Sequence, residues 1–193
     1  MADFLTAYRK TMGHEGGYAN HPDDEGGETF AGIARNSNPG WSGWKLIDQL
    51  KKTYPRARWD EVMLGNADLM AWVRALYKAN YWDVNRLDQV KSQAIANELF
   101  DTGVNMGVEI AAEFLQRALN MTNENAKLYR DIAVDRQVGP MTLGLLNTHP
   151  NSYDVYKWLN VLQGARYVQI LERKTPQEVF ARSWISRVDF VKI

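Results

Sequence analysis

The sequence predicts a mainly α-helical protein built as two lobes with a cleft. Apolar residues recur at three- and four-residue spacing in segments along most of the chain, as is typical of helices that bury one face. No region alternates apolar and polar residues over several strands, so at most a short β-hairpin is expected within residues 18–33. With 193 residues, 45% of them hydrophobic, the chain is long enough to bury a sizeable core.

The first helix is expected over residues 3–15. Phe4, Tyr8 and Met12 fall at helical spacing and define one apolar face. Glu15 continues that face at the last turn, and the two glycines that follow it end the helix. Apolar surroundings and the negative end of the helix dipole both raise the pKa of a carboxyl group. A glutamate protonated near neutral pH is what a general acid requires.

A short polar segment rich in glycine comes next. Asp24 follows Glu15 by nine residues, and Thr29 follows Asp24 by five. A turn through Pro22 and glycines 26–27 can fold both side chains back towards Glu15. Two carboxyl groups and a hydroxyl at one cleft suit the hydrolysis of a glycosidic bond. The alternative is a solvated acidic loop, because each of the short patterns is weak when taken singly.

The stretch from residue 15 to residue 33 resembles the signature EGGY…DxGGxT…GI of glycoside hydrolase family 108, the bacterial and phage N-acetylmuramidases that cut peptidoglycan. It is also similar to the catalytic region of phage-type lysozymes. The resemblance implies a lysozyme-like fold with Glu15 as the general acid. Asp24 and Thr29 are then candidate holders of the attacking water, and Tyr18 is a candidate substrate contact. The matching residues are Glu15-Gly16-Gly17-Tyr18, Asp24-Glu25-Gly26-Gly27-Glu28-Thr29 and Gly32-Ile33.

Trp41 and Trp44 occur in an irregular stretch rich in serine and glycine. Two interpretations stay open: the rings stack on sugars at the rim of the cleft, or they cover a satellite of the core. After them, residues 66–80 have the clearest helical periodicity, with Asn66 as N-cap. The expected inward residues of that helix are Leu69, Trp72, Val73, Leu76 and Tyr77. Tyr81-Trp82-Asp83 follows, resembles the family's YWD and is expected to pack.

Two further helices are expected at residues 92–104 and 107–120. The segment between them, FDTGVNMG, resembles the family's fD..VN.G. Asp101 is expected to brace the catalytic loop, because a polar group in an apolar stretch must be hydrogen-bonded when it is buried. Asn105 is a candidate for substrate binding in the cleft, with bracing as the alternative.

The stretch DRQVGPMT at residues 135–142 resembles the DGxIGPxT turn of a predicted peptidoglycan-binding half that accompanies this family. Arg136 stands where that pattern has glycine. Because a non-glycine residue disfavours positive φ, either the turn changes shape or Arg136 bears strain. A long helix follows from Tyr153, and near the C-terminus Trp184 and Arg187 resemble the family's closing W..R. Trp184 is expected in the core, and Arg187 is expected to pair with a carboxylate.

Composition limits the partners. Lysine plus arginine and aspartate plus glutamate number 23 each, giving a formal net charge of +0, so general attraction to nucleic acid or membrane is not indicated. Peptidoglycan is anionic too, so its capture must rest on local contacts. Zero cysteines exclude disulfides and cysteine metal sites. A metal hydrolase using His14, His21, Asp23 and Asp24 lacks an HExxH motif, so neither a metal nor another cofactor is expected.

The resemblance covers nearly the whole chain and divides it into a catalytic lobe, residues 1–93, and a helical half resembling a predicted peptidoglycan-binding domain, residues 94–193, packed as one compact unit. No apolar run approaches the ~18 residues of a membrane span, and the N-terminus lacks a Sec signal pattern. We therefore expect an endolysin-like monomer made in the cytoplasm, which reaches the wall through a holin or a secretion system.

The predicted activity is cleavage of the β-1,4 bond between N-acetylmuramic acid and N-acetylglucosamine, as in lysozymes. Inversion is favoured, because a turn separates Glu15 from Asp24 and Thr29 and leaves room for a water. A non-catalytic wall-binding module is one alternative. A lytic transglycosylase is another, although that route needs no pair of residues to hold water.

Overall fold

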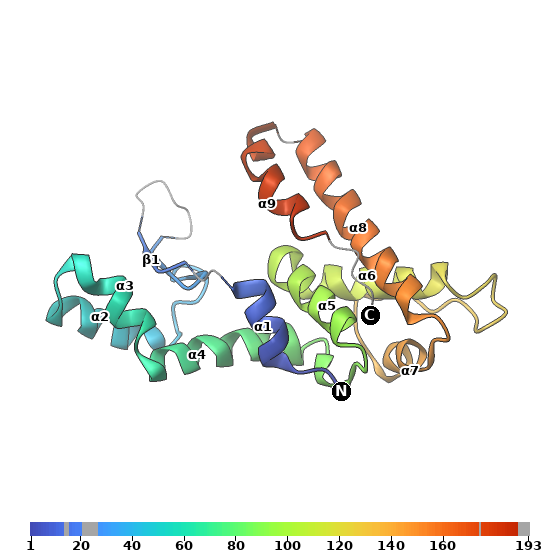
Figure 1. The fold of residues 1–193 in the computed structure, drawn as a ribbon, viewed down its shortest axis with the longest axis horizontal. Helices are drawn as coiled ribbons and strands as arrows, with labels where there is room; N and C mark the ends of the chain where they lie inside the picture. Colours follow the sequence, from blue (N-terminus) through green and yellow to red (C-terminus); the bar gives the residue numbers. More distant parts are fainter. Residues whose placement is uncertain (14–15, 21–26, 174, 189–193) are drawn as a thin grey trace. The chain divides into compact units, whose positions relative to one another are not determined.

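The computed structural model describes residues 1–13, 16–20, 27–173 and 175–188. Over these residues the protein is mainly helical with one small antiparallel sheet (Figure 1), which confirms the predicted fold class. Contacts divide the chain into two compact units, Met1–Thr11 with Asn80–Ile193, and Met12–Ala79. These units are defined by contacts between residues and not by function. The predicted division into a catalytic lobe, residues 1–93, and a second half, residues 94–193, stays a prediction.

The smaller unit carries the sheet. Its strands are β1 (Tyr18–Ala19), β2 (Thr29–Phe30) and β3 (Ile33–Ala34), paired in the order β1-β2-β3. The predicted hairpin is therefore extended by a third short strand. The helical elements of this unit are α2 (Gly43–Thr53), the 3-10 helix η1 (Arg56–Arg58), α3 (Trp59–Leu64) and α4 (Ala67–Tyr77).

The tight turn between β2 and β3 explains the Gly-Ile pair of the motif. Ala31 and Gly32 both have positive φ, 47° and 76°, as a two-residue turn of type I′ requires. The Tyr77 hydroxyl donates to the Ala31 carbonyl at 3.0 Å. A Cβ atom at Gly32 would lie 2.5 Å from that hydroxyl, so only glycine fits. Helix α4 thereby fixes the end of the sheet.

Helix α4 begins as the sequence predicts, with the Asn66 side chain accepting from the Leu69 N–H at 2.9 Å. Leu69, Val73 and Tyr77 form its buried face. Trp72 is 40% exposed, so its predicted inward position is wrong. The physical reason is spacing: the buried residues recur every four positions, and Trp72 lies about 100° around the helix from Val73.

Helix α1 (Phe4–Met12) brings apolar side chains into the larger unit. Phe4 packs against Tyr8 at 5.5 Å, Trp82 at 5.7 Å and Phe100 at 5.8 Å between ring centroids. The expected packing role of the Tyr81-Trp82-Asp83 stretch is confirmed for Trp82, which is fully buried. The helix ends before Gly13, a poor helix former, and so stops earlier than predicted.

Three long helices form the centre of the larger unit. They are α5 (Gln93–Met106), α6 (Val108–Met121) and α8 (Ser152–Arg173), green, yellow and orange in Figure 1. Each packs against the other two, burying apolar faces such as Ile95, Leu99, Leu115 and Leu159. The remaining elements are the π-helix η2 (Lys78–Asp83), the 3-10 helices η3 (Leu87–Gln89) and η4 (Thr175–Phe180), and helices α7 (Pro140–Thr148) and α9 (Ala181–Ile185).

Candidate active site

The predicted acid Glu15 and the predicted water-holding Asp24 both lie outside the described residues, and their roles stay predictions. In the sequence, Glu15 comes three residues before β1, and Asp24 belongs to the stretch that joins β1 to β2. The described residues at the two ends of this stretch therefore form the framework that carries the predicted catalytic groups.

Thr29 is the predicted catalytic residue that the structure describes. It lies in β2, paired with Ala19 of β1 on one side and with Ala34 of β3 on the other. Its hydroxyl donates to the Gly27 carbonyl at a long 3.3 Å. This bond uses the hydroxyl proton and leaves the oxygen lone pairs able to accept from a water. The water-holding role of Thr29 stays a prediction.

Glu28, next to Thr29, is the centre of an ion-pair cluster that the sequence analysis missed. Its side chain is 10% exposed, and its two oxygens lie 2.5 Å from Lys51 Nζ and 2.5 Å from Arg35 Nη1. Arg35 in turn donates two bonds to the Asp48 carboxylate, at 2.9 and 2.7 Å. The cluster ties β2 to helix α2. No periodic pattern marks it, because its members are scattered between residues 28 and 51.

Glu28 is held in its charged form. Burial raises the pKa of its carboxyl group, but hydrogen bonds from Lys51, Arg35 and Tyr18 together outweigh burial, and the net pKa is lowered from the ordinary value of 4.5. A carboxyl group with a lowered pKa is a poor proton donor at neutral pH. Glu28 is therefore a structural anion rather than a second candidate for the general acid.

Tyr18, a predicted substrate contact, is 6% exposed and part of the same cluster. Its ring packs edge-on against Trp59 at 5.1 Å, and its hydroxyl accepts from Lys51 Nζ at 3.0 Å. Its N–H donates to Asp60 Oδ1 at 2.7 Å. These contacts anchor the start of β1 to helices α2 and α3. Substrate binding by Tyr18 stays a prediction beside this packing role.

Sterics explain why the second glycine of the EGGY motif, Gly17, is a glycine. A Cβ atom at Gly17 would overlap the Asp60 carboxyl group. Only glycine lets that carboxylate come close enough to accept from the Tyr18 N–H. The chain immediately after Glu15 is thus held against α3 by a contact that depends on a missing side chain.

Trp41 and Trp44 differ in burial, which bears on the two interpretations given above, sugar stacking and core packing. Trp44 is 2% exposed, donates through Nε1 to the Asn38 carbonyl at 2.8 Å and lies under the Arg35 guanidinium at 5.1 Å. It belongs to the core of the smaller unit. Trp41 is half-buried and packs edge-on against Trp44 at 5.2 Å. Sugar stacking at a rim therefore remains a prediction that suits Trp41 better than Trp44.

Comparison with known protein families decides what this framework belongs to. The family described as Glycosyl hydrolase 108 matches residues 8–107, which include the whole motif and the cluster around it. The chain belongs to glycoside hydrolase family 108. A second family, described as a Predicted Peptidoglycan domain, matches residues 110–189. The two matches together support a peptidoglycan hydrolase, in agreement with the resemblance found in the motifs.

Solved structures give the same fold. Brucella abortus SagA matches with a TM-score of 0.58 and 21% identity, covering 96% of this chain and 88% of that one. At this identity the likeness shows the fold alone. None of the curated proteins compared matches the sequence.

An ion pair joins the two family matches. Arg187 in the second match donates to Asp101 in the first, at 2.6 Å, and Gln163 donates to the other Asp101 oxygen at 3.1 Å. The predicted pairing of Arg187 with a carboxylate is confirmed. Asp101 is a brace between Arg187 and Gln163, whereas its predicted bracing of the catalytic loop stays a prediction. Burial raises the pKa of Asp101, and the Arg187 charge offsets part of that effect. Asn105 is exposed and donates to the Asp101 carbonyl at 2.8 Å, and its substrate contact stays a prediction.

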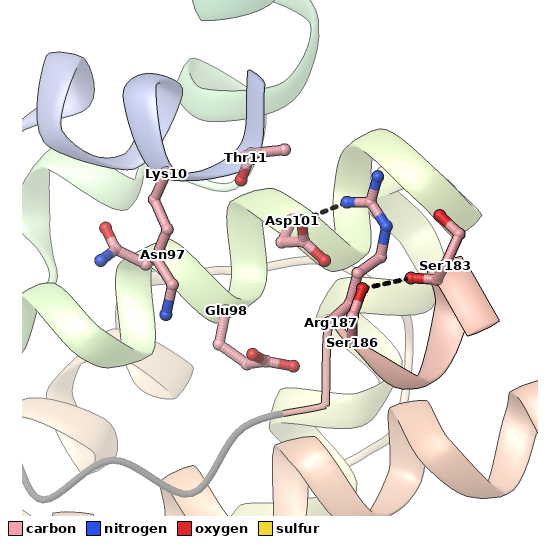
Figure 2. A pocket seen from close by; sticks show the side chains of 8 residues that line it. All are labelled: Lys10, Thr11, Asn97, Glu98, Asp101, Ser183, Ser186 and Arg187. Atoms are coloured by element: carbon pink, nitrogen blue, oxygen red, sulfur yellow. Dashed lines mark hydrogen bonds and ion pairs between the residues drawn. The ribbon is translucent and has the colours of Figure 1, made fainter. Parts of the chain in front are cut away.

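A polar pocket of about 230 Å³ opens beside this pair. Figure 2 shows the Asp101–Arg187 contact within it, together with Glu98, which is 5% exposed. A catalytic pair needs a carboxyl group left available to a water, whereas Asp101 is engaged by Arg187 and Gln163. The pocket is therefore part of the brace. Its lining residues are Lys10, Thr11, Asn97, Glu98, Asp101, Ser183, Ser186 and Arg187.

The described residues show neither a metal centre nor a membrane span. Over the described ranges, no three histidine, aspartate or glutamate side chains gather where they would hold a metal ion. Nor does any helix in these ranges combine the length and the apolarity needed to cross a membrane.

Proposed function

We propose that the protein is an N-acetylmuramidase, which hydrolyses the β-1,4 bond between N-acetylmuramic acid and N-acetylglucosamine in peptidoglycan. The observation that carries the proposal is the family 108 match over residues 8–107, because it spans the complete Glu, Asp, Thr motif. The Predicted Peptidoglycan domain at residues 110–189 supports the same substrate. Glu15 is the proposed general acid.

The framework around the motif suits this role. The Gly17–Asp60 approach holds the chain just after Glu15, and the Glu28 ion pairs hold it just before Thr29. Both ends of the stretch that contains Asp24 are therefore fixed to helices of the smaller unit. Catalysis depends on such positioning, since small displacements of reacting groups cost large factors in rate.

In the proposed reaction, Glu15 gives its proton to the glycosidic oxygen as the bond from the anomeric carbon to that oxygen breaks. Asp24 and Thr29 hold a water on the opposite face of the sugar. The water oxygen bonds to the anomeric carbon, and its proton passes to the Asp24 carboxylate. The products are a new reducing end and a new free hydroxyl, with inversion at the anomeric carbon.

Product analysis tests the proposal against its two alternatives. Purified peptidoglycan is digested with the full chain, and the fragment ends are identified by mass spectrometry. Hydrolysis gives reducing N-acetylmuramic acid ends, whereas a lytic transglycosylase gives anhydro ends. A wall-binding module gives no fragments. NMR of the first product from a defined glycan, recorded before mutarotation, is expected to show the α anomer, and a β anomer would mean retention.

A further inference from the structure

Two adjoining hollows run along helix α8 of the larger unit. Their volumes are about 330 and 400 Å³, and they adjoin at Arg166 and Gln169, which line both. The two hollows together are named the arginine groove. Helix α6 contributes its other wall near Glu113 and Arg117. The remaining lining residues are Ile110, Phe114, Arg136, Leu162 and Ala165 in the first hollow, and Ile170, Arg173, Gln177 and Trp184 in the second.

This arginine groove is strongly basic, although the whole chain has no net charge. Among the residues that the structure describes, four guanidinium groups line it, those of Arg117, Arg136, Arg166 and Arg173, against one carboxylate, that of Glu113. Glu113 lies 2.8 Å from Arg136 and 3.3 Å from Arg117. One carboxylate thus aligns two guanidinium groups and leaves three positive charges in excess along the groove.

Arg136 reaches the groove from a strained backbone. Its φ is +64°, in the left-handed region, so the sequence alternative in which Arg136 bears strain is the one the structure adopts. The buried Gln116 holds the turn by accepting from the Arg136 N–H at 2.9 Å and donating to Asp135 at 2.6 Å. Residues with a strained backbone are found most often at functional sites, such as those that hold a ligand.

The groove offers charge rather than a stacking surface. Its tryptophan, Trp184, is stacked on Tyr167 at 5.1 Å and on Phe180 at 6.0 Å. Trp184 is half-buried at the wall of the second hollow, so its predicted place in the core is wrong. Phe114 is buried beneath the first hollow. Exposed guanidinium groups remain, and their paired N–H groups match the geometry of a carboxylate.

We propose that the arginine groove binds the free carboxylates of peptidoglycan stem peptides, so that the second half of the chain recognises the peptide rather than the sugar strand. This inference rests on the proposed function, because it takes the wall as the substrate. The arginine groove would supply the local contacts by which a protein without net charge holds an anionic polymer. Arg166 is the central residue, since it lines both hollows.

The test measures binding of a soluble stem peptide to the full chain by calorimetry. One peptide has free carboxylates, and its partner has every carboxylate amidated. The free-acid peptide is expected to bind roughly ten- to a hundredfold more tightly than the amidated one, the range for hydrogen bonds to charged groups. Arg166→Glu is expected to abolish that difference. Arg130→Glu, an exposed arginine of the same unit outside the groove, is the matched control and is expected to preserve it.

Arg136→Gly provides a second variant that is expected to fold. Glycine accepts the positive φ without strain, so the midpoint of thermal unfolding should hold or rise while affinity for the free-acid peptide falls. Unchanged affinity in this variant, or in Arg166→Glu, overturns the proposal. So does equal binding of both peptides, binding of neither, or tighter binding of a short oligonucleotide, which would indicate a general polyanion site.

The result of the peptide-binding test does not depend on whether the proposed hydrolysis is correct. The stem peptide contains no glycosidic bond, so its binding is measured whether or not the protein cleaves glycan. Conversely, the protein could cleave glycan and yet show no preference for the free-acid peptide. That result would support the proposed hydrolysis and overturn the proposed role of the arginine groove.

Discussion

At the scale of single residues, Glu28 shows how the motif is built. It lies between Gly27 and Thr29 of the motif, yet its side chain serves the fold, accepting from Lys51 and Arg35. A family motif therefore mixes residues proposed for chemistry with residues that only hold them in place. Sequence alone does not separate the two kinds, because both are glutamates beside glycines.

Removing the Glu28 charge is expected to destabilise the smaller unit. Glu28→Gln leaves Lys51 and Arg35 without their shared carboxylate, and hydrogen bonds to charged groups are worth about 2 kcal/mol. The free energy of unfolding, measured with urea, should fall by about that amount. Glu61→Gln, which removes a fully exposed carboxylate paired with Arg58, is the control and should cause no measurable change.

The same variant should change how stability depends on pH. The folded-state pKa of Glu28 is lowered, so its contribution is present above the ordinary value of 4.5 and is lost as pH falls through the lower folded value. The parent should therefore lose stability on acidification more steeply than Glu28→Gln. Identical slopes in urea titrations between neutral and acid pH would show that Glu28 is not held ionised.

At the scale of elements, close approaches of backbone position the sheet. Gly17 admits Asp60 of α3, and Gly32 admits Tyr77 of α4. The sequence predicts both glycines through the motif, and it predicts the Asn66 cap through a local rule. Their partners are not predictable, because Asp60 and Tyr77 are distant in sequence from these glycines. Periodicity places Tyr77 on the buried face of α4 but does not say which backbone it meets. The prediction that Trp72 points inward is wrong for a related reason. Periodicity shows which side of a helix is buried, but it does not show how wide the buried side is.

Gly17→Ala is expected to impair activity more than stability. The added methyl group overlaps the Asp60 carboxylate, so that carboxylate turns away and loses its bond to the Tyr18 N–H, or the start of β1 moves. Either change releases the chain next to Glu15 from α3. Turnover of peptidoglycan should fall at least roughly tenfold. Gly40→Ala places its methyl group in open space in the same unit and should keep the parent's rate. A parent-like rate for Gly17→Ala would separate this contact from catalysis.

At the scale of the whole molecule, the Asp101–Arg187 pair joins the segments matched by the two families. The helices were predictable from periodicity, and a carboxylate partner for Arg187 was expected from the resemblance. That this partner is Asp101 was not predictable, because the two residues are far apart in sequence. The arginine groove was not predictable, since its arginines come from α6, the 135–137 turn and α8. In the sequence, only Arg136, which stands where the family pattern has glycine, pointed to this region.

Breaking this pair is expected to loosen the larger unit. Arg187→Gln leaves a mostly buried Asp101 carboxylate without its countercharge, and such losses cost about 3 kcal/mol. Adding Asp101→Asn should recover part of that cost, because the unpaired charge is then gone. Urea unfolding of the four members of this double-mutant cycle measures the coupling. Additive losses would show that the contact contributes no pairwise energy.

The motif is proposed to serve acid catalysis by Glu15, and the Glu15→Gln variant isolates that role. Glutamine keeps the shape of the side chain and removes its proton-donating ability. The release of reducing ends from purified peptidoglycan should fall by roughly 10²- to 10⁴-fold, the usual contribution of a positioned acid, while circular dichroism and thermal unfolding match the parent. A folded Glu15→Gln variant that releases reducing ends at a rate near the parent's would show that Glu15 is not the general acid.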